Sequence, residues 1–110
     1  MDKISVIVPC FNEEDVVALF YKETSKVLQL INNVDYELLF INDGSKDHTE
    51  HVLKELALKD PHCIYYTFSR NFGKEAAMFA GLEKAQGNYV VIMDADLQHP
   101  PKLLPEMYHA

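Results

Sequence analysis

Two aspartates one residue apart, Asp94 and Asp96, are the residues of this chain whose type and spacing best suit chemistry. They follow the apolar run 89–93, which has the pattern of a buried β-strand, and Pro100-Pro101 shows that the strand has ended by then. Two charges so close to a buried strand are costly unless they face a cation or a donor. Together with the amide oxygen of Gln98, they suit Mg²⁺ or Mn²⁺ with positions left open for phosphate oxygens. A solvated turn is the alternative, because Asp is common in turns.

The composition of the 110 residues indicates one small globular domain or a piece of a larger one, since 48% of the residues are hydrophobic. No window of about 18 apolar residues predicts a membrane span, and no signal-peptide pattern opens the chain. The formal net charge of −7 argues against nucleic acid or an anionic bilayer as a partner and is compatible with an acidic, metal-recruiting site.

The two cysteines, Cys10 and Cys63, have neither metal-ligand spacing nor a C-x-x-C motif. On parallel strands they are expected at opposite edges of the sheet, about 20 Å apart and beyond the reach of a disulfide. Both are therefore predicted to be reduced core thiols, as in a cytoplasmic protein.

Apolar runs with the pattern of strands alternate with helical periodicity along the whole chain. A capping box is predicted at Asp47-x-x-Glu50, and Gly87 is predicted to end the third helix. The expected strands are 3–9, 36–42, 63–69 and 89–93. Two helices are expected at 12–32, with Asn12 as N-cap, and at 74–85. Another is expected from Asp47 to before Pro61, and a last one begins at Pro105.

This alternation predicts a Rossmann-type α/β fold, a parallel sheet with helices on both faces. Right-handed crossovers place every strand-to-helix loop at the carboxyl edge of the sheet, where ligands of open α/β sheets bind. The loops expected there are 9–14, 43–45, 70–74 and 94–98. The chain lacks G-x-G-x-x-G and the phosphate-loop lysine motif, which weakens dehydrogenase and ATPase interpretations.

Each candidate residue in these loops can be interpreted as a ligand contact or as an ordinary structural residue. The Asp43 carboxylate can accept an N–H from a base, or the residue can simply form a turn. Arg70 and Lys74 can pair with phosphate or be ordinary surface charges. Phe11 can stack on a base or close the end of the core.

Four motifs, in order, resemble the family 2 inverting glycosyltransferases, and the similarity covers essentially all 110 residues. The closest likeness is to the polyprenyl-phosphate branch, which acts with dolichol or undecaprenyl phosphate in the synthesis of cell-envelope glycans. The motifs are Val-Ile-Val-Pro-Cys-Phe-Asn-Glu-Glu (6–14), Ile-Asn-Asp-Gly-Ser (41–45), Ser-Arg-Asn-Phe-Gly-Lys-Glu-Ala-Ala (69–77) and Asp-Ala-Asp-Leu-Gln-His-Pro-Pro (94–101).

The resemblance implies a GT-A-like fold and assigns roles to individual residues. The D-x-D motif of the family corresponds to Asp94, Ala95 and Asp96, which would meet the sugar nucleotide and its metal, with Gln98 as a further metal ligand. Arg70 and Lys74 belong to a motif of the branch and are expected near the donor. The nucleoside pocket would be formed by Pro9, Phe11 and Glu13, with Ile41 and Asp43 holding the base.

By the same resemblance, residues 1–110 are the sugar-nucleotide-binding N-terminal part of a glycosyltransferase domain. The expected donor is a UDP-sugar and the expected acceptor a polyprenyl phosphate. The catalytic base is expected beyond Ala110, so these residues alone are predicted to be inactive. The longer protein is expected at the cytoplasmic face of a membrane, and exposed apolar surface predicts a homo-oligomer.

Two rival functions stay open at this point. A nucleotidyltransferase also places metal-bound aspartates on such a fold, but it would carry a Gly-rich basic loop where this chain has Asn12-Glu13-Glu14. A non-catalytic α/β binding module, similar to a response regulator, would bind Mg²⁺ without preferring UDP.

Overall fold

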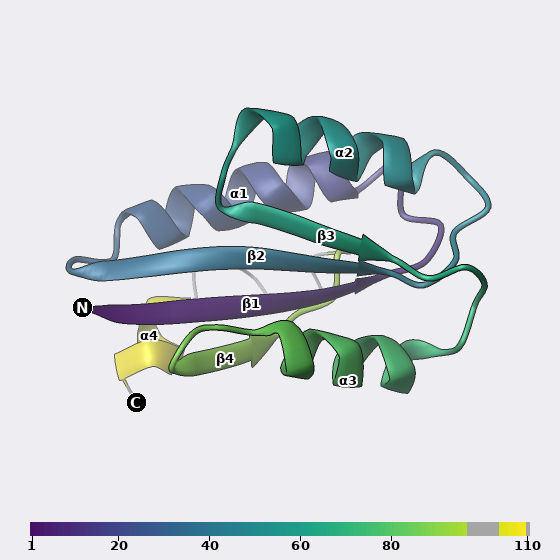
Figure 1. The fold of residues 1–110 in the computed structure, drawn as a ribbon. Coiled ribbons are helices and arrows are strands. Elements are labelled where there is room, and N and C mark those ends of the chain that lie inside the picture. Colours follow the sequence, from purple (N-terminus) through teal and green to yellow (C-terminus); the bar gives the residue numbers. More distant parts are fainter. Residues whose placement is uncertain (97–103, 110) are drawn as a thin grey trace.

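The computed structural model describes residues 1–96 and 104–109, which form a four-stranded parallel sheet with helices packed against both faces (Figure 1). The elements follow one another as β1 (Asp2–Cys10), α1 (Val17–Gln29), β2 (Val34–Asn42), α2 (Thr49–Lys59), β3 (Cys63–Thr67), α3 (Lys74–Lys84), β4 (Tyr89–Ile92) and α4 (Leu104–His109). The predicted fold class, with strands and helices alternating along the chain, is confirmed.

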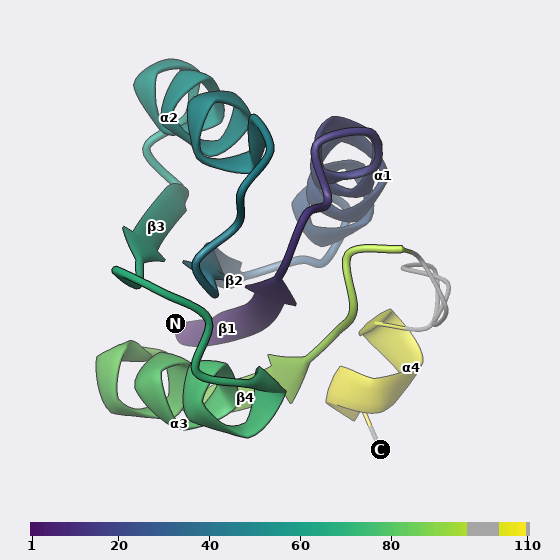
Figure 2. The same cartoon turned by 90° about the vertical axis from the view of Figure 1, so that its right-hand side faces the viewer.

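The sheet has the strand order β3-β2-β1-β4, so β1 and β2 are its inner strands. Cys10 pairs with Asn42, which pairs with Thr67, so three strands end at the same level. The shorter β4 pairs with Ile4–Ile7 of β1, and an extended segment then leads to Asp94. All arrowheads point the same way in Figure 1, and Figure 2 views the molecule from that carboxyl edge.

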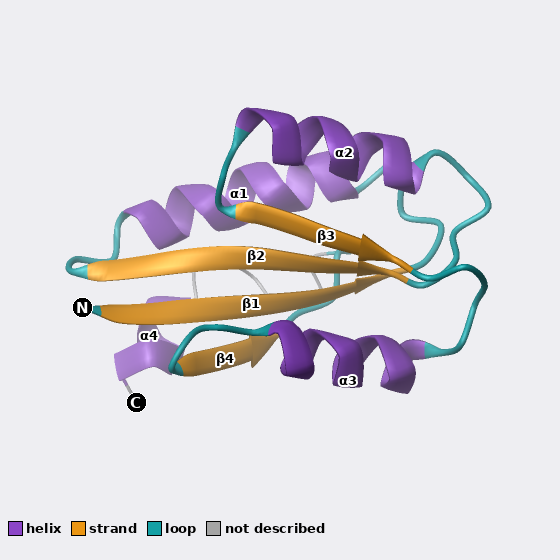
Figure 3. Cartoon of the chain, viewed as in Figure 1, coloured by secondary structure: helices purple, strands orange, loops and turns teal. Residues whose placement is uncertain are grey.

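The two faces of the sheet carry different helices (Figures 2 and 3). The larger core cluster lies under α1, α2 and α4 and includes Phe20, Leu28 and Leu53. The opposite face packs on α3, whose small residues allow a close approach. A Cβ added to Gly81 would lie 2.4 Å from the Ile7 Cγ2 atom, so α3 lies almost against β1. The inner strands are buried on both faces, which explains their unbroken apolar runs.

The first helix begins later than the sequence pattern predicts. α1 starts at Val17 and has no acidic residue in its first turn, so Asn12 is not its N-cap. Asn12 instead adopts a left-handed conformation with φ of 53°, and its side chain accepts a hydrogen bond from Lys46 N. Because the loop after β2 takes up the polar groups of Asn12, the segment before Val17 does not join the helix.

Two other local predictions are wrong for similar reasons. The Asp47 carboxylate accepts hydrogen bonds from Thr49 N and Glu14 N, so it bridges two loops and does not form the predicted capping box. α3 ends at Lys84, before Gly87. A Cβ on Gly87 would lie 2.6 Å from Lys3 O, so this glycine is required for close contact with β1.

Both cysteines are free and buried, as predicted. Cys63 pairs with Leu38, which is opposite Val6, so Cys10 lies four positions further along β1 on a strand two away. That offset corresponds to about 16 Å, somewhat less than the distance expected from the sequence and still far beyond disulfide reach.

One buried hydroxyl in α1 lacks a hydrogen-bond partner among the described residues. The Thr24 side chain is fully buried, and its Oγ1 finds neither a donor nor an acceptor. We expect Thr24→Val, which keeps the shape and removes the unsatisfied group, to raise the free energy of unfolding by about 1 kcal/mol. Urea denaturation measures the change, and Thr24→Ser, which keeps the hydroxyl, should destabilise the protein.

Within the described residues, none of the helices combines the length and the apolar character needed to cross a bilayer.

Candidate functional site

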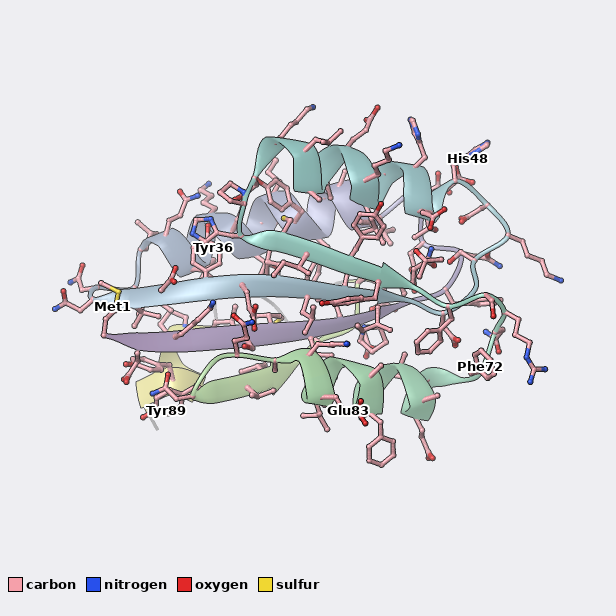
Figure 4. All side chains as sticks on the ribbon, viewed as in Figure 1. Met1, Tyr36, His48, Phe72, Glu83 and Tyr89 are labelled. Carbon is pink, nitrogen blue, oxygen red and sulfur yellow. The ribbon has the colours of Figure 1, made fainter. Side chains whose placement is uncertain are left out.

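A pocket of about 460 Å³ opens at the carboxyl edge of the sheet, a volume within the range of ligand sites. Figure 4 places Phe72 and His48 at this end of the molecule and Met1, Tyr36 and Tyr89 at the other. The lining residues come from all four strand-to-helix loops: Pro9, Cys10, Phe11, Glu13, Asp43, Asn71, Gly73, Lys74, Asp94 and Asp96. The topology thus brings together residues up to 87 positions apart in the sequence (Pro9 to Asp96).

The loop after β1 is fastened to the loop after β2. Asn12 N donates to Ser45 Oγ at 2.9 Å, and Glu13 N donates to Thr49 Oγ1 at 2.8 Å. Ser45 is held in turn by Asn42 Oδ1, which accepts hydrogen bonds from the Ser45 backbone and hydroxyl. These bonds fix the backbone that carries Phe11 and Glu13 into the pocket.

The loop after β2 is fastened in the same way to the loop after β3, through Asp43. The side chain of Asp43 is buried, with the residue 4% exposed. Its carboxylate accepts hydrogen bonds from Phe72 N at 2.7 Å, Gly73 N at 3.0 Å and Asn71 Nδ2 at 3.2 Å. Asp43 therefore acts as an anchor for the segment that starts α3, while still lining the pocket.

Gly44 makes this contact between loops possible. It has φ of 66°, and an added Cβ would lie 2.2 Å from the Arg70 carbonyl carbon and 2.4 Å from Asn71 N. Any side chain at position 44 would push the two loops apart, which gives the glycine of the Asp-Gly-Ser motif a specific structural reason.

The acidic side of the pocket carries one ion pair. Lys74 Nζ, at the first residue of α3, lies 2.6 Å from Asp94 Oδ1, which follows β4. Burial raises the pKa of the Glu13 carboxyl, and the charges of Asp96, Asp94 and Asp47 raise it further. The Lys74 ammonium lowers the same pKa. Carboxylates from three loops, those after β1, β2 and β4, thus influence one another electrostatically, and Lys74 offsets part of their charge.

The donor set matches a hard divalent cation only in part. Among the described residues, no group of three or more His, Cys, Asp or Glu side chains is placed to hold a metal by itself. Asp94 and Asp96 supply carboxylates, and the ammonium against Asp94 shows that this side of the pocket accommodates positive charge. Such a pair suits a cation that takes its remaining ligands from phosphate oxygens and water. Gln98, the third expected ligand, lies outside the described residues.

Seven of the residues predicted for the site lie together at the pocket: Pro9, Phe11, Glu13, Asp43, Lys74, Asp94 and Asp96. Three others do not line it. Ile41 and Ala95 have no exposed surface and pack in the core. Arg70 is exposed, and its guanidinium lies 4.5 Å above the Phe72 ring, outside the pocket.

The pocket also contains three residues that the motifs did not single out, namely Cys10, Asn71 and Gly73. Burial raises the pKa of the Cys10 thiol far above its ordinary value, which disfavours the nucleophilic thiolate form. Asn71 and Gly73 belong to the third motif, 69–77, together with Lys74. This shared motif was the sequence signal that could have assigned them to the pocket.

Comparison with known sequences places the chain among glycosyltransferases. The family model described as glycosyl transferase family 2 matches residues 5–110. A bactoprenol glucosyl transferase of Shigella phage SfV is 48% identical over 105 residues, which cover 96% of this chain and 34% of the relative. An undecaprenyl-phosphate 4-deoxy-4-formamido-L-arabinose transferase of Proteus mirabilis is 36% identical and is matched over 97% of this chain and 33% of its own length.

Solved structures agree with this assignment. Glucosyl-3-phosphoglycerate synthase from Mycobacterium tuberculosis, in complex with UDP, superposes with a TM-score of 0.70 at 26% identity over 94% of this chain and 38% of its own. A mannosyltransferase from Pyrobaculum calidifontis, in complex with GDP-Man and Mn²⁺, gives 0.65 at 26% identity over 86% of this chain and 28% of its own. The chain spans about a third of the length of the curated relatives it matches. With four motifs in order, a GT-A-like sheet and a match over nearly its full length, the chain belongs to glycosyl transferase family 2.

Proposed function

We propose that the pocket binds the nucleoside diphosphate part of a nucleotide-sugar, with Mg²⁺ or Mn²⁺, in a protein that transfers the sugar to a polyprenyl phosphate. The observation that carries this proposal is the convergence of Asp94, Asp96 and Lys74 with the exposed ring of Phe11 in the lining of one pocket. The charged side chains suit a diphosphate and its cation, and the aromatic ring suits the base of a nucleoside.

Each group has a chemical task in this proposal. A divalent cation, when bound, would offset the charge that grows on the departing diphosphate. The Asp94 and Asp96 carboxylates would hold that cation, and the Lys74 ammonium is within reach of the same phosphates. Phe11, 42% exposed, offers a face for the base, and Asp43 lines the same pocket.

The acceptor and the outcome of the transfer are proposed for the longer protein. The two curated relatives are named for bactoprenol and undecaprenyl phosphate, so a polyprenyl phosphate is the proposed acceptor. An inverting transfer needs a group that orients or deprotonates the acceptor on the face of the sugar opposite the diphosphate. We propose that the longer protein supplies this group and acts at the cytoplasmic face of a membrane. Self-association of residues 1–110 through exposed apolar surface stays a prediction.

Calorimetric titration tests the proposal. UDP and GDP with Mn²⁺ are expected to bind at least about tenfold more tightly than the same nucleotides in EDTA, because the diphosphate completes the coordination of the cation. Asp96→Asn is expected to remove most of this difference, whereas Asp15→Asn, on an exposed carboxylate of the neighbouring loop, should leave it unchanged. Equal binding in EDTA, or equal binding of Mn²⁺ with no nucleotide preference, would contradict a sugar-nucleotide site and favour a plain metal-binding module.

A further inference from the structure

The ion pair between Lys74 and Asp94 joins the start of α3 to the segment that follows β4. Lys74 is the first residue of α3, whereas Asp94 follows β4 on the other side of the crossover. The Nζ to Oδ1 distance is 2.6 Å, and the two side chains are 58% and 26% exposed. The pair therefore lies at the mouth of the pocket, open to solvent and to a ligand.

The position of Lys74 is set by the anchored loop before it. The two preceding residues, Phe72 and Gly73, donate their backbone N–H groups to the buried Asp43 carboxylate. The start of α3 is therefore fixed, and the long Lys74 side chain is the part that can swing. A surface ion pair of this kind contributes only about 0–1 kcal/mol, so a ligand of modest affinity can break it.

The ammonium also lies where a cation is needed. Glu13, Asp94 and Asp96 line the same pocket as Lys74, and a positive charge against Asp94 reduces their mutual repulsion. A divalent cation bound by Asp94 would have to displace the ammonium from Oδ1. A diphosphate, in turn, offers the displaced ammonium a new partner of higher negative charge.

We propose that Lys74 holds the place of the divalent cation at Asp94 until the donor arrives, and then moves to the diphosphate. This inference rests on the proposed function, because it takes the ligand to be a nucleoside diphosphate with its cation. In this arrangement the cation alone binds weakly and the two ligands bind together. By linkage, each must raise the affinity of the other by the same factor.

Titrations of Mn²⁺ in the absence of nucleotide, followed by electron paramagnetic resonance of the free ion, test the inference directly. Lys74→Gln is expected to bind Mn²⁺ up to about fivefold more tightly than the unaltered protein, because the competing ammonium is gone. The same variant is expected to bind UDP with Mn²⁺ less tightly, so the coupling between the two ligands becomes smaller. Lys74→Arg, which keeps the charge, should resemble the unaltered protein in its Mn²⁺ affinity.

A matched control separates a local effect from the general effect of removing a positive charge. Lys84→Gln removes the same charge at the other end of α3, where the ammonium lies 5.2 Å from the centre of the Tyr66 ring. Its Mn²⁺ affinity should stay within about twofold of the unaltered protein. Circular dichroism confirms folding of each variant, which the exposure of Lys74 favours.

The inference and the proposed function fail in different measurements. An unchanged or weaker Mn²⁺ affinity in Lys74→Gln, or an equal gain in Lys84→Gln, would overturn the role of Lys74 even if UDP still requires Mn²⁺ for binding. A Mn²⁺ affinity that rises in Lys74→Gln while neither protein binds UDP or GDP would support the competition at Asp94 and reject the nucleotide site.

Discussion

Asp43→Ala is expected to weaken the binding of nucleoside diphosphates by about tenfold or more and to lower the free energy of unfolding by about 2 kcal/mol. The Asp43 carboxylate is buried and accepts hydrogen bonds from Phe72 N, Gly73 N and Asn71 Nδ2. Without it these donors lose their acceptor, and each unsatisfied polar group costs about 1–3 kcal/mol unless water reaches it. The start of α3, and with it Lys74, then loses its fixed position.

Calorimetry with UDP and Mn²⁺, together with urea denaturation, measures both effects on one variant. Asp43→Asn should fall between the two proteins, because its amide oxygen replaces only part of the carboxylate. Asp15→Ala removes an exposed carboxylate from the loop after β1 and should leave stability and affinity nearly unchanged. If Asp43→Ala keeps full stability and loses only affinity, the residue contacts the base and does not anchor the loop.

This expectation revises the simplest interpretation of the motif. Ile-Asn-Asp-Gly-Ser at positions 41–45 suggests a base-binding aspartate whose removal leaves the fold intact. The structure shows that the same carboxylate is engaged by a loop about 30 residues further along the chain. Asp43 both anchors this loop and lines the pocket, so one substitution changes the stability of the protein and its affinity for nucleotide together. Both quantities therefore have to be measured.

The fold was predictable because its signals are local and repeated. The apolar runs of β1 and β2 are unbroken since both strands are buried on two faces, and the helical spacing between them leaves few alternatives to a parallel sheet. The carboxyl-edge position of Asp43, Lys74, Asp94 and Asp96 then follows from right-handed crossovers alone. The strand–helix alternation therefore predicts that these residues lie near one another, even without any known motif.

The loops were less predictable because their partners are distant in the sequence. Asn12 has the composition of an N-cap, yet its side chain and backbone bond with Lys46 and Ser45, more than 30 residues away. Ile41 and Ala95 belong to binding motifs, but their side chains are buried in the core. A sequence motif specifies the types of residues and not the directions of their side chains. Gly87 resembles a helix stop and in fact serves close packing on β1.

A buried carboxylate at the opposite end of the sheet received no attention from the motifs. Glu37, in β2, is 2% exposed, and its Oε2 atom accepts hydrogen bonds from Ser5 Oγ and Gln86 N. Ser5 Oγ accepts in turn from Gly87 N at 2.8 Å, and Lys3 Nζ lies 4.0 Å from Glu37 Oε1. This network fixes the turn between α3 and β4, the two elements that carry Lys74 and lead to Asp94.

Glu37→Ala is therefore expected to destabilise the protein more than any exposed substitution, by about 3 kcal/mol or more in the free energy of unfolding. The change leaves the Ser5 hydroxyl and the Gln86 N–H without their acceptor in a buried place and opens a cavity beneath the turn between α3 and β4. For a chain of this size the melting temperature should fall by about 10 °C or more. Denaturation by urea and by heat measures the loss.

Two variants separate the network from the mere loss of a glutamate. Glu37→Gln keeps an oxygen that can accept from both donors and should cost about 1 kcal/mol, while Glu83→Ala, on the exposed side of α3 (Figure 4), should cost less than about 0.5 kcal/mol. Because the turn connects α3 to the strand that leads to Asp94, Glu37→Ala should also weaken the binding of UDP with Mn²⁺ at a temperature where the variant is still folded. Full stability of Glu37→Ala would mean that water or a rearranged turn satisfies the freed donors, and that packing at Gly81 and Gly87 suffices to hold this region against β1.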